Sequence, residues 1–279
     1  MKTRLITAGV AIVVAVALIV LGSFYSIVVT IALALISALL CGEYLSAKKL
    51  NKDIRIFIPC LVFSVLIPLL STTHQVNEQL LPYFLLAIVL FVLTSSILSV
   101  VFHATLKTED MIFAAAGVLL ISLSLSTLNM LVLNDPQHAA FWIVISLGIP
   151  WFADSAAYFA GSSFGKRKLC PNISPNKTVE GAMAGVLVGT LIPLLLGFIF
   201  KLIYGQITIY YGILVLVGFI NSLVSIFGDL TFSVIKRSCK IKDYGSIMPG
   251  HGGLLDRFDS VLFCLPLVYI FSQIFYFCV

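Results

Sequence analysis

The feature that most constrains this chain is a succession of long apolar segments separated by short polar stretches. Nine segments follow one another, and most approach the roughly 20 residues that a helix needs to cross a bilayer. Because backbone N–H and C=O groups in lipid must be bonded within the membrane, helices are their expected form. The sequence therefore predicts an all-α, polytopic integral membrane protein with about nine transmembrane helices. The segments are Leu5–Gly22, Phe24–Cys41, Ile56–Leu70, Leu80–Phe102, Met111–Leu133, Ala139–Gly161, Gly181–Tyr204, Ile207–Ile235 and Phe258–Val279.

The composition excludes a soluble domain. Charged residues make up 10% of the chain and hydrophobic residues 60%, whereas soluble domains carry about 25% charged residues. The six cysteines show neither a CxxC motif nor a spacing shared with histidine, so we expect no disulfide framework and no zinc site. The net charge of +5 belongs to the loops of a membrane protein, and no nucleic-acid partner is expected.

The basic residues predict the orientation, because short loops rich in Lys and Arg stay in the cytoplasm. If the N-terminus is cytoplasmic, every Lys and Arg except Lys201 falls in or beside an inner segment. We therefore expect an outer C-terminus and cytoplasmic loops at 162–180 and 236–257. The first five spans, within residues 1–138, carry no charged residue in their interiors and are expected to be scaffold. Residues 139–279, with four spans, are expected to form the catalytic region.

Two carboxylates interrupt the apolar segments of the catalytic region. Asp154 and Asp229 each precede a cytoplasmic loop by about seven residues, so both lie on the order of 10 Å below the inner ends of their helices. A charge at that depth is costly and marks a candidate functional site, although a structural ion pair between two helices is the alternative. Asp229, Ser233 and Lys236 share one helix face by their spacing. Two carboxylates at matched depth can face one water-filled cavity open to the cytoplasm.

The two expected cytoplasmic loops combine positive charge with turn residues. The first provides four basic side chains, and Thr178 or Asn176 can cap the helix that follows, with Glu180 in its first turn. The second sets a Pro-Gly-His-Gly-Gly turn before Asp256 and Asp259, which share a helix face. Carboxylates within the membrane, beneath basic residues in the cytoplasmic loops, suit the binding of a nucleoside triphosphate with a divalent metal. The carboxylates hold the cation, while basic groups and glycine-rich backbone hold the phosphates. Basic loops beside membranes also attract anionic head groups, so the lysines alone are weak evidence.

At this point the residues resemble a known family, the phosphatidate cytidylyltransferases, also called CDP-diacylglycerol synthases. The chain matches the family's C-terminal motif, S-x-x-K-R-x4-K-D-x-G-x3-P-G-H-G-G-x-x-D-R-x-D, over Ser233–Asp259. It also matches the family's pattern around the sixth span over Asp154–Gly181. The chain departs from the family at Ser162, where a basic residue is frequent, and at Phe232, where an acid is common. Met248 stands where Leu, Ile or Phe is usual.

The resemblance implies that the protein forms CDP-diacylglycerol and pyrophosphate from CTP and phosphatidate, with Mg²⁺ alone or with a second cation. It also implies a site at the cytoplasmic face of the bacterial inner membrane, contact with membrane lipid, and a homodimer. No heptad or G-x-x-x-G pattern indicates the dimer interface on its own.

The resemblance and the chemistry of the residues together predict the site. The expected catalytic residues are Asp154, Asp229, Lys236, His251 and Asp256. The expected metal ligands are Asp229, Asp256 and Asp259. The expected substrate-binding residues are Lys166, Lys168, Ser174, Lys177, Thr178, Ser233, Arg237, Lys242, Asp243, Gly252, Gly253 and Arg257.

Two other functions are considered. A CTP-dependent enzyme that acts on a prenyl lipid or polyprenol would need the same site chemistry, and the long C-terminal match favours the diacyl substrate. A cation transporter would line its ion path with Asp154 and Asp229. Such a path needs access from both faces, whereas the outer loops are short and nearly uncharged.

Overall fold

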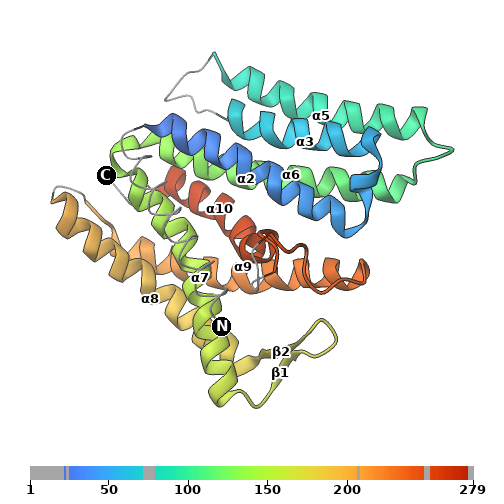
Figure 1. The fold of residues 1–279 in the computed structure, drawn as a ribbon. Helices are drawn as coiled ribbons and strands as arrows, with labels where there is room; N and C mark the ends of the chain where they lie inside the picture. Colours follow the sequence, from blue (N-terminus) through green and yellow to red (C-terminus); the bar gives the residue numbers. More distant parts are fainter. Residues whose placement is uncertain (1–21, 23–24, 72–78, 206–207, 248–251, 276–279) are drawn as a thin grey trace. The chain divides into compact units, whose positions relative to one another are not determined.

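The computed structural model of the chain consists almost entirely of helices, as predicted (Figure 1). Its described residues are 22, 25–71, 79–205, 208–247 and 252–275. The chain divides into two compact units. The first unit contains residues 1–139 and 239–257, and the second contains residues 140–238 and 258–279. The segment between the last two helices thus groups with the N-terminal helices.

The first unit is built around four long helices. Helix α2 packs against α3 and α6, and α3 also packs against α5 and α6 (Figure 1). The elements are α2 (Ser26–Ala47), η1 (Leu50–Lys52), α3 (Ile54–Leu70), α5 (Leu81–Val101), α6 (Thr108–Asn134) and η2 (Pro136–His138).

A buried polar network joins three of these helices. Asn129 of α6 accepts a hydrogen bond from Thr30 Oγ1 of α2 over 2.7 Å. Its Nδ2 donates to Ser71 Oγ, at the end of α3, over 2.7 Å. All three side chains are buried. Such interhelical hydrogen bonds contribute roughly 1 kcal/mol or less each in membranes, and they also fix which helices are neighbours.

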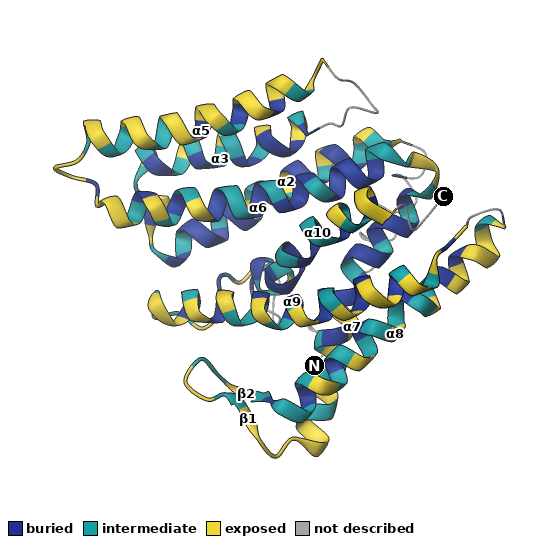
Figure 2. Ribbon diagram, turned by 180° about the vertical axis from the view of Figure 1, so that it is seen from behind, coloured by how far each residue is buried: buried dark blue, intermediate teal, exposed yellow. Residues whose placement is uncertain are grey.

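Helix α5 leaves most of its apolar surface exposed, as the long stripe of yellow in Figure 2 shows. It buries only Phe84, Ala87 and Phe91. Exposed Leu, Ile and Val side chains suit contact with lipid tails, which are as apolar as they are. This pattern agrees with a membrane-spanning helix at the periphery of its unit.

The second unit contains two complete long helices and most of two others, together with a short hairpin. Helix α8 packs against α9, and the strands precede α8 directly. The two strands pair antiparallel, with Lys168 opposite Thr178 and Cys170 opposite Ser174. The hairpin was not predicted, because its strands are too short to show an alternating pattern. The elements are α7 (Ala139–Phe164), β1 (Lys168–Cys170), β2 (Ser174–Thr178), α8 (Val179–Tyr204), α9 (Tyr211–Ser238) and α10 (Leu255–Phe275).

Three glycines at four-residue spacing let α8 approach its neighbours closely. A Cβ atom on Gly185 would lie 2.9 Å from the carbonyl oxygen of Ala153 in α7. A Cβ atom on Gly189 would lie 2.7 Å from Ser222 Cβ in α9. With Gly181, these residues form a G-x-x-x-G-x-x-x-G pattern, which was not predicted to have a packing role, and here it serves packing within one chain.

The number of spans differs from the prediction. Within the described residues, seven helices are long and apolar enough to cross a membrane, rather than nine. Helix α3 is shorter, with 17 residues, and contains Pro59 and Pro68. The first expected segment, Leu5–Gly22, lies outside the described residues except for Gly22. The predicted segment Ile56–Leu70 was already shorter than the others, and α3, although two residues longer, still falls below the roughly 20 residues that a bilayer span needs.

Candidate active site

Asp154 lies within α7 and is held by serines from two other helices. Ser260 Oγ of α10 donates a hydrogen bond to Asp154 Oδ2 over 2.7 Å. Ser225 Oγ of α9 donates to Asp154 Oδ1 over 3.3 Å. Both serines are buried. Three helices therefore meet at one carboxylate, which receives the polar partners that a charge within apolar helices needs.

Asp229 of α9 is paired with a lysine of the hairpin. Lys177 Nζ lies 2.5 Å from Asp229 Oδ2. Ser233 Oγ, one turn further along α9, donates to Asp229 Oδ1 over 3.3 Å. Asp229 and Ser233 therefore share one helix face, as their spacing predicts. The ion pair joins the hairpin to α9 at the position of the carboxylate.

Asp259 of α10 is the most buried of the three acids, with 7% of its surface exposed. Its Oδ1 accepts the backbone N–H of Ser260 over 2.8 Å, and its Oδ2 lies 3.9 Å from Lys236 Nζ. Asp229 and Asp154 both interact electrostatically with Asp259. We call the three carboxylates and their two lysines the aspartate cluster. Its members are Asp154, Asp229, Asp259, Lys177 and Lys236.

The hairpin is fixed to α8 through residues at the start of that helix. Thr178 Oγ1 accepts the backbone N–H of Gly181 over 3.1 Å, so Thr178 is the helix cap, one of the two predicted alternatives. Glu180 accepts the backbone N–H groups of Lys166 and Arg167 over 3.0 and 3.2 Å. Those N–H groups are thus bonded to a carboxylate. A phosphate would therefore meet the side chains of this loop rather than its backbone at Lys166 and Arg167.

Residues 239–247 and 252–254, the described residues between α9 and α10, belong to the first unit, and we call them the glycine loop. This loop folds around Asp256, whose Oδ2 accepts the backbone N–H groups of Tyr244 and Gly253 over 2.9 and 3.0 Å. Gly252 has φ +85°, in the left-handed region that favours glycine. His251, the predicted catalytic histidine, lies outside the described residues.

The other predicted substrate-binding residues are more exposed. Ser174 is half-buried in β2, and Arg237 Nε donates to the carbonyl oxygen of Ile173 over 3.4 Å, which links the end of α9 to the hairpin. Their roles stay predictions. The exposed members of the set are Lys166, Lys168, Arg237, Lys242, Asp243 and Arg257.

Glu43 was not among the predicted site residues. The apolar segment was predicted to end at Cys41, whereas α2 continues to Ala47 and carries Glu43 as a buried residue. The carboxylate accepts the backbone N–H of Leu255, at the start of α10, over 2.7 Å. A signal was available, because Glu43 is the first acidic residue of the chain and stands directly beside an apolar segment.

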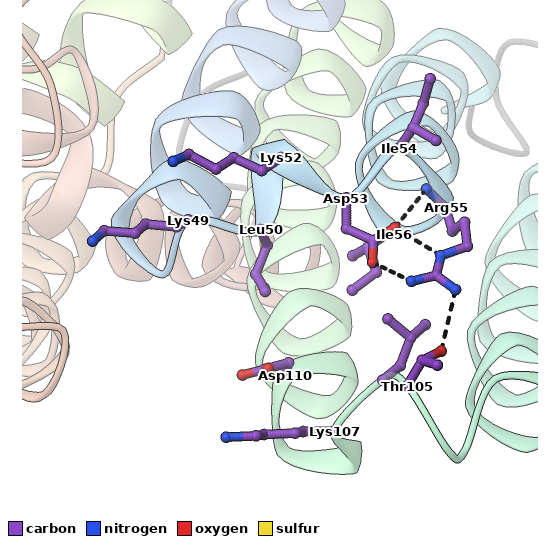
Figure 3. Close-up of a pocket in the computed structure, with 11 residues that line it drawn as sticks. Lys49, Leu50, Lys52, Asp53, Ile54, Arg55, Ile56, Thr105, Lys107 and Asp110 are labelled. Carbon is purple, nitrogen blue, oxygen red and sulfur yellow. Dashed lines mark hydrogen bonds and ion pairs between the residues drawn. The ribbon is translucent and has the colours of Figure 1, made fainter.

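A hollow of about 490 Å³ opens near the turn between α2 and α3 (Figure 3). Lys49, Lys52 and Lys107 line it and extend toward the same side of the view. Arg55 binds Asp53 instead, and its hydrogen bonds hold the pKa of the Asp53 carboxyl below its usual value. The hollow has the charge to attract an anionic head group. Its two carboxylates, Asp53 and Asp110, are each paired with a basic side chain, Arg55 and Lys48.

Comparison with known protein families shows to which family this chain belongs. Residues 2–275 match the model described as the cytidylyltransferase family. The chain belongs to this family. Cytidylyltransferase family members are nucleotidyltransferases, so the aspartate cluster and the glycine loop are to be understood as candidates for nucleotide chemistry.

Relatives within the cytidylyltransferase family bear the name phosphatidate cytidylyltransferase. The Bacillus subtilis relative is 44% identical over 142 residues, which are 51% of each chain. The Haemophilus influenzae relative is 40% identical over 149 residues, 52% of this chain and 48% of the relative. The Staphylococcus saprophyticus relative is 34% identical over 169 residues, 60% and 63% of the two chains. The chain thus spans about half the length of the first two relatives that it matches.

The oxygen donors of the aspartate cluster suit the Mg²⁺ that the family resemblance implies. Among the residues that the structure describes, no three acidic, His or Cys side chains are gathered into a complete metal cage. Mg²⁺ does not require one, because it is commonly held by one or two carboxylates together with water and substrate phosphates. Three carboxylates against two ammonium groups also leave one negative charge in excess when all are ionised. Asp229 and Asp259, two of the three predicted metal ligands, belong to the cluster.

Proposed function

We propose that this member of the cytidylyltransferase family is a phosphatidate cytidylyltransferase, which converts CTP and phosphatidate into CDP-diacylglycerol and pyrophosphate. The observation that carries the proposal is the aspartate cluster. Three carboxylates and two lysines from α7, α9, α10 and the hairpin interact inside one unit of otherwise apolar helices. The names of the relatives support the choice of phosphatidate as the lipid substrate.

In the proposed reaction, an oxygen of the phosphatidate phosphate attacks the α-phosphorus of CTP. A new P–O bond forms, the bond from the α-phosphorus to the oxygen that bridges it to the β-phosphorus breaks, and pyrophosphate leaves with the electron pair. Bound Mg²⁺ supplies neutralisation of the triphosphate and the leaving group. Such a transfer depends on positioning and charge neutralisation, so the protein needs no covalent nucleophile.

Within the cluster, the proposal gives the acids and the lysines different tasks. Asp229 and Asp259 would hold Mg²⁺, which would neutralise charge on the triphosphate. Asp154 keeps α7, α9 and α10 in register through Ser225 and Ser260, and it is therefore a positioning residue.

Lys177 and Lys236 neutralise carboxylates in the absence of nucleotide, and an ammonium group released from a carboxylate can bind a phosphate oxygen. The predicted roles of Asp256, His251 and the other substrate-binding residues are retained as part of the proposal from the resemblance.

We place the site at the cytoplasmic face of a bacterial inner membrane. If α8 and α9 each cross once, the hairpin before α8 and the end of α9 lie on the same side. Both regions are rich in Lys and Arg, which favours the cytoplasm. The homodimer implied by the resemblance stays a prediction.

The reaction is tested by measuring pyrophosphate release from purified protein in detergent, with CTP, phosphatidate and Mg²⁺ each omitted in turn. We expect release only with all three, and CDP-diacylglycerol in equal amount. Release with a polyprenol lipid but not with phosphatidate would support the prenyl-lipid alternative. No release with any lipid would contradict the proposal.

The metal assignment needs a matched pair of variants. Asp229→Asn keeps the shape of the side chain and removes its charge, and we expect a loss of turnover that excess Mg²⁺ only partly restores. Glu109→Gln makes the same chemical change at an exposed position in the first turn of α6, and we expect no loss. Full Mg²⁺-dependent turnover by Asp229→Asn would remove Asp229 from the metal site.

A further inference from the structure

Glu43 is a buried carboxylate far in sequence from all the predicted site residues. It lies in α2, and 6% of its surface is exposed. A carboxylate inside an apolar helix is costly unless polar groups compensate it. Within the described residues, no hydrogen bond reaches its Oε1 atom. Because the burial of the Glu43 carboxylate is unfavourable by itself, we expect this residue to have a specific role.

The partner of Glu43 is the first residue of α10. Glu43 Oε2 accepts the backbone N–H of Leu255 over 2.7 Å, across 212 residues of sequence. The first N–H groups of a helix have no partner within that helix, and a carboxylate there also faces the positive end of the helix dipole. Glu43 thus caps α10 from a different helix.

The glycine loop is shaped to admit this carboxylate. A Cβ atom on Gly253 would lie 2.7 Å from Glu43 Oε2. A Cβ atom on Gly245 would meet Glu43 Oε1 more closely still. A side chain at either position would displace the Glu43 carboxylate, and a Cβ atom at position 253 would also lie 2.7 Å from the backbone nitrogen of Gly245. These contacts supply a steric reason for two glycines of the C-terminal motif.

The neighbouring residue, Tyr44, holds the other side of the same loop. Its ring stacks with that of Tyr244, with 6.4 Å between centroids. The backbone N–H of Tyr244 in turn donates to Asp256, the residue after Leu255. Glu43 and Tyr44 therefore fix the two backbone segments that define where the Asp256 carboxylate lies.

We propose that Glu43 is a positioning residue for Asp256, acting by anchoring the glycine loop and the start of α10 to α2. This inference rests on the proposed function, in which Asp256 takes part in catalysis. The helix that was expected to be scaffold thus becomes part of the machinery that orders the site. Glu43 itself needs no contact with substrate.

The test compares three substitutions at Glu43. Glu43→Gln keeps an oxygen that can accept the Leu255 N–H, whereas Glu43→Asp is one methylene too short and Glu43→Ala has no acceptor. Because a misplacement of about 1 Å can lower a rate by about 100-fold, we expect the Ala and Asp variants to lose at least about tenfold in kcat. We expect Gln to retain most of the kcat and the KM for CTP to change less than kcat.

Hydrogen exchange of residues 252–260 provides a readout that does not depend on activity. We expect faster exchange at this segment in Glu43→Ala than in the unmodified protein and in Glu43→Gln. Asn129→Ala is the control for general loosening, because it breaks a buried network of the same unit without touching the glycine loop. It should lower the melting temperature and leave exchange at residues 252–260 unchanged.

The outcomes separate the two proposals. Unchanged hydrogen exchange together with unchanged kcat in Glu43→Ala would overturn the proposed role of Glu43. Hydrogen exchange at residues 252–260 that became faster to the same extent in Glu43→Ala and Asn129→Ala would overturn it as well. Faster exchange in Glu43→Ala, in a protein whose unmodified form releases no pyrophosphate, would support the anchor and contradict the proposed reaction.

Discussion

Replacing Gly189 with alanine should displace the helices that carry the aspartate cluster. The new Cβ atom would lie 2.7 Å from Ser222 Cβ and 3.1 Å from Ala153 Cβ. Because carbon atoms in ordinary contact are about 3.5–4.0 Å apart, α8 and its neighbours must separate by roughly 1 Å. Ala153 precedes Asp154, and Ser222 lies one turn before Ser225, so the shift falls on a 3.3 Å hydrogen bond that has little room to lengthen.

The size of the effect follows from that displacement. Overpacking of this kind costs about 1–3 kcal/mol of stability. A 1 Å misplacement of reacting groups can cost about 100-fold in rate, so we expect the Gly189→Ala protein to lose at least about tenfold in kcat for pyrophosphate release. Its melting temperature in detergent should fall as well.

Gly212→Ala is the matched control, because the same change in α9 meets no atom within 4 Å. It should leave kcat unchanged and keep or slightly raise the melting temperature, since alanine favours helix by up to about 1 kcal/mol over glycine. If Gly189→Ala behaved like Gly212→Ala in both measurements, close packing of α8 would not position the cluster. A lower melting temperature with unchanged kcat would limit Gly189 to a packing role.

Three further predictions concern stability, each measured by thermal unfolding in detergent. Ser260→Ala removes a buried hydrogen bond to Asp154 and should cost about 1–3 kcal/mol, whereas exposed Ser238→Ala should cost little. Thr178→Ala removes the cap of α8 and should cost about 1 kcal/mol, most of which Thr178→Ser restores; equal losses would exclude the cap. Asp53→Asn should cost less than about 1 kcal/mol at neutral pH. Because Arg55 lowers the pKa of Asp53 in the folded protein, the stability that their ion pair contributes is fully present above the pKa of Asp53 in the unfolded chain. It is lost as the pH falls through the lower pKa of the folded protein. A difference in stability between Asp53→Asn and the unmodified protein that persisted in strong acid would contradict this prediction.

The sequence alone located most of the helices. The segment predicted at Leu80–Phe102 is α5, Leu81–Val101, because a continuous apolar run in lipid has few alternatives to a helix. It also identified Thr178 as a possible cap and placed Asp229 and Ser233 on one face, since both depend on local spacing. The sixth and eighth predicted segments were identified as candidate parts of the site because each contains a carboxylate, which an apolar helix rarely carries without a function.

Only the tertiary structure decided which distant groups meet. Nothing local pairs Lys177 with Asp229, Ser260 with Asp154, or Glu43 with Leu255. Glu43 lies just past an apolar run, and its burial depends on a loop about 200 residues later, which no window of sequence contains. The glycine spacing of α8 indicates close packing, but the identity of the neighbouring helix is set by shape and by the hydrogen bonds that form there. Local propensity and hydropathy therefore determine the elements, whereas long-range packing and polar pairing determine the site.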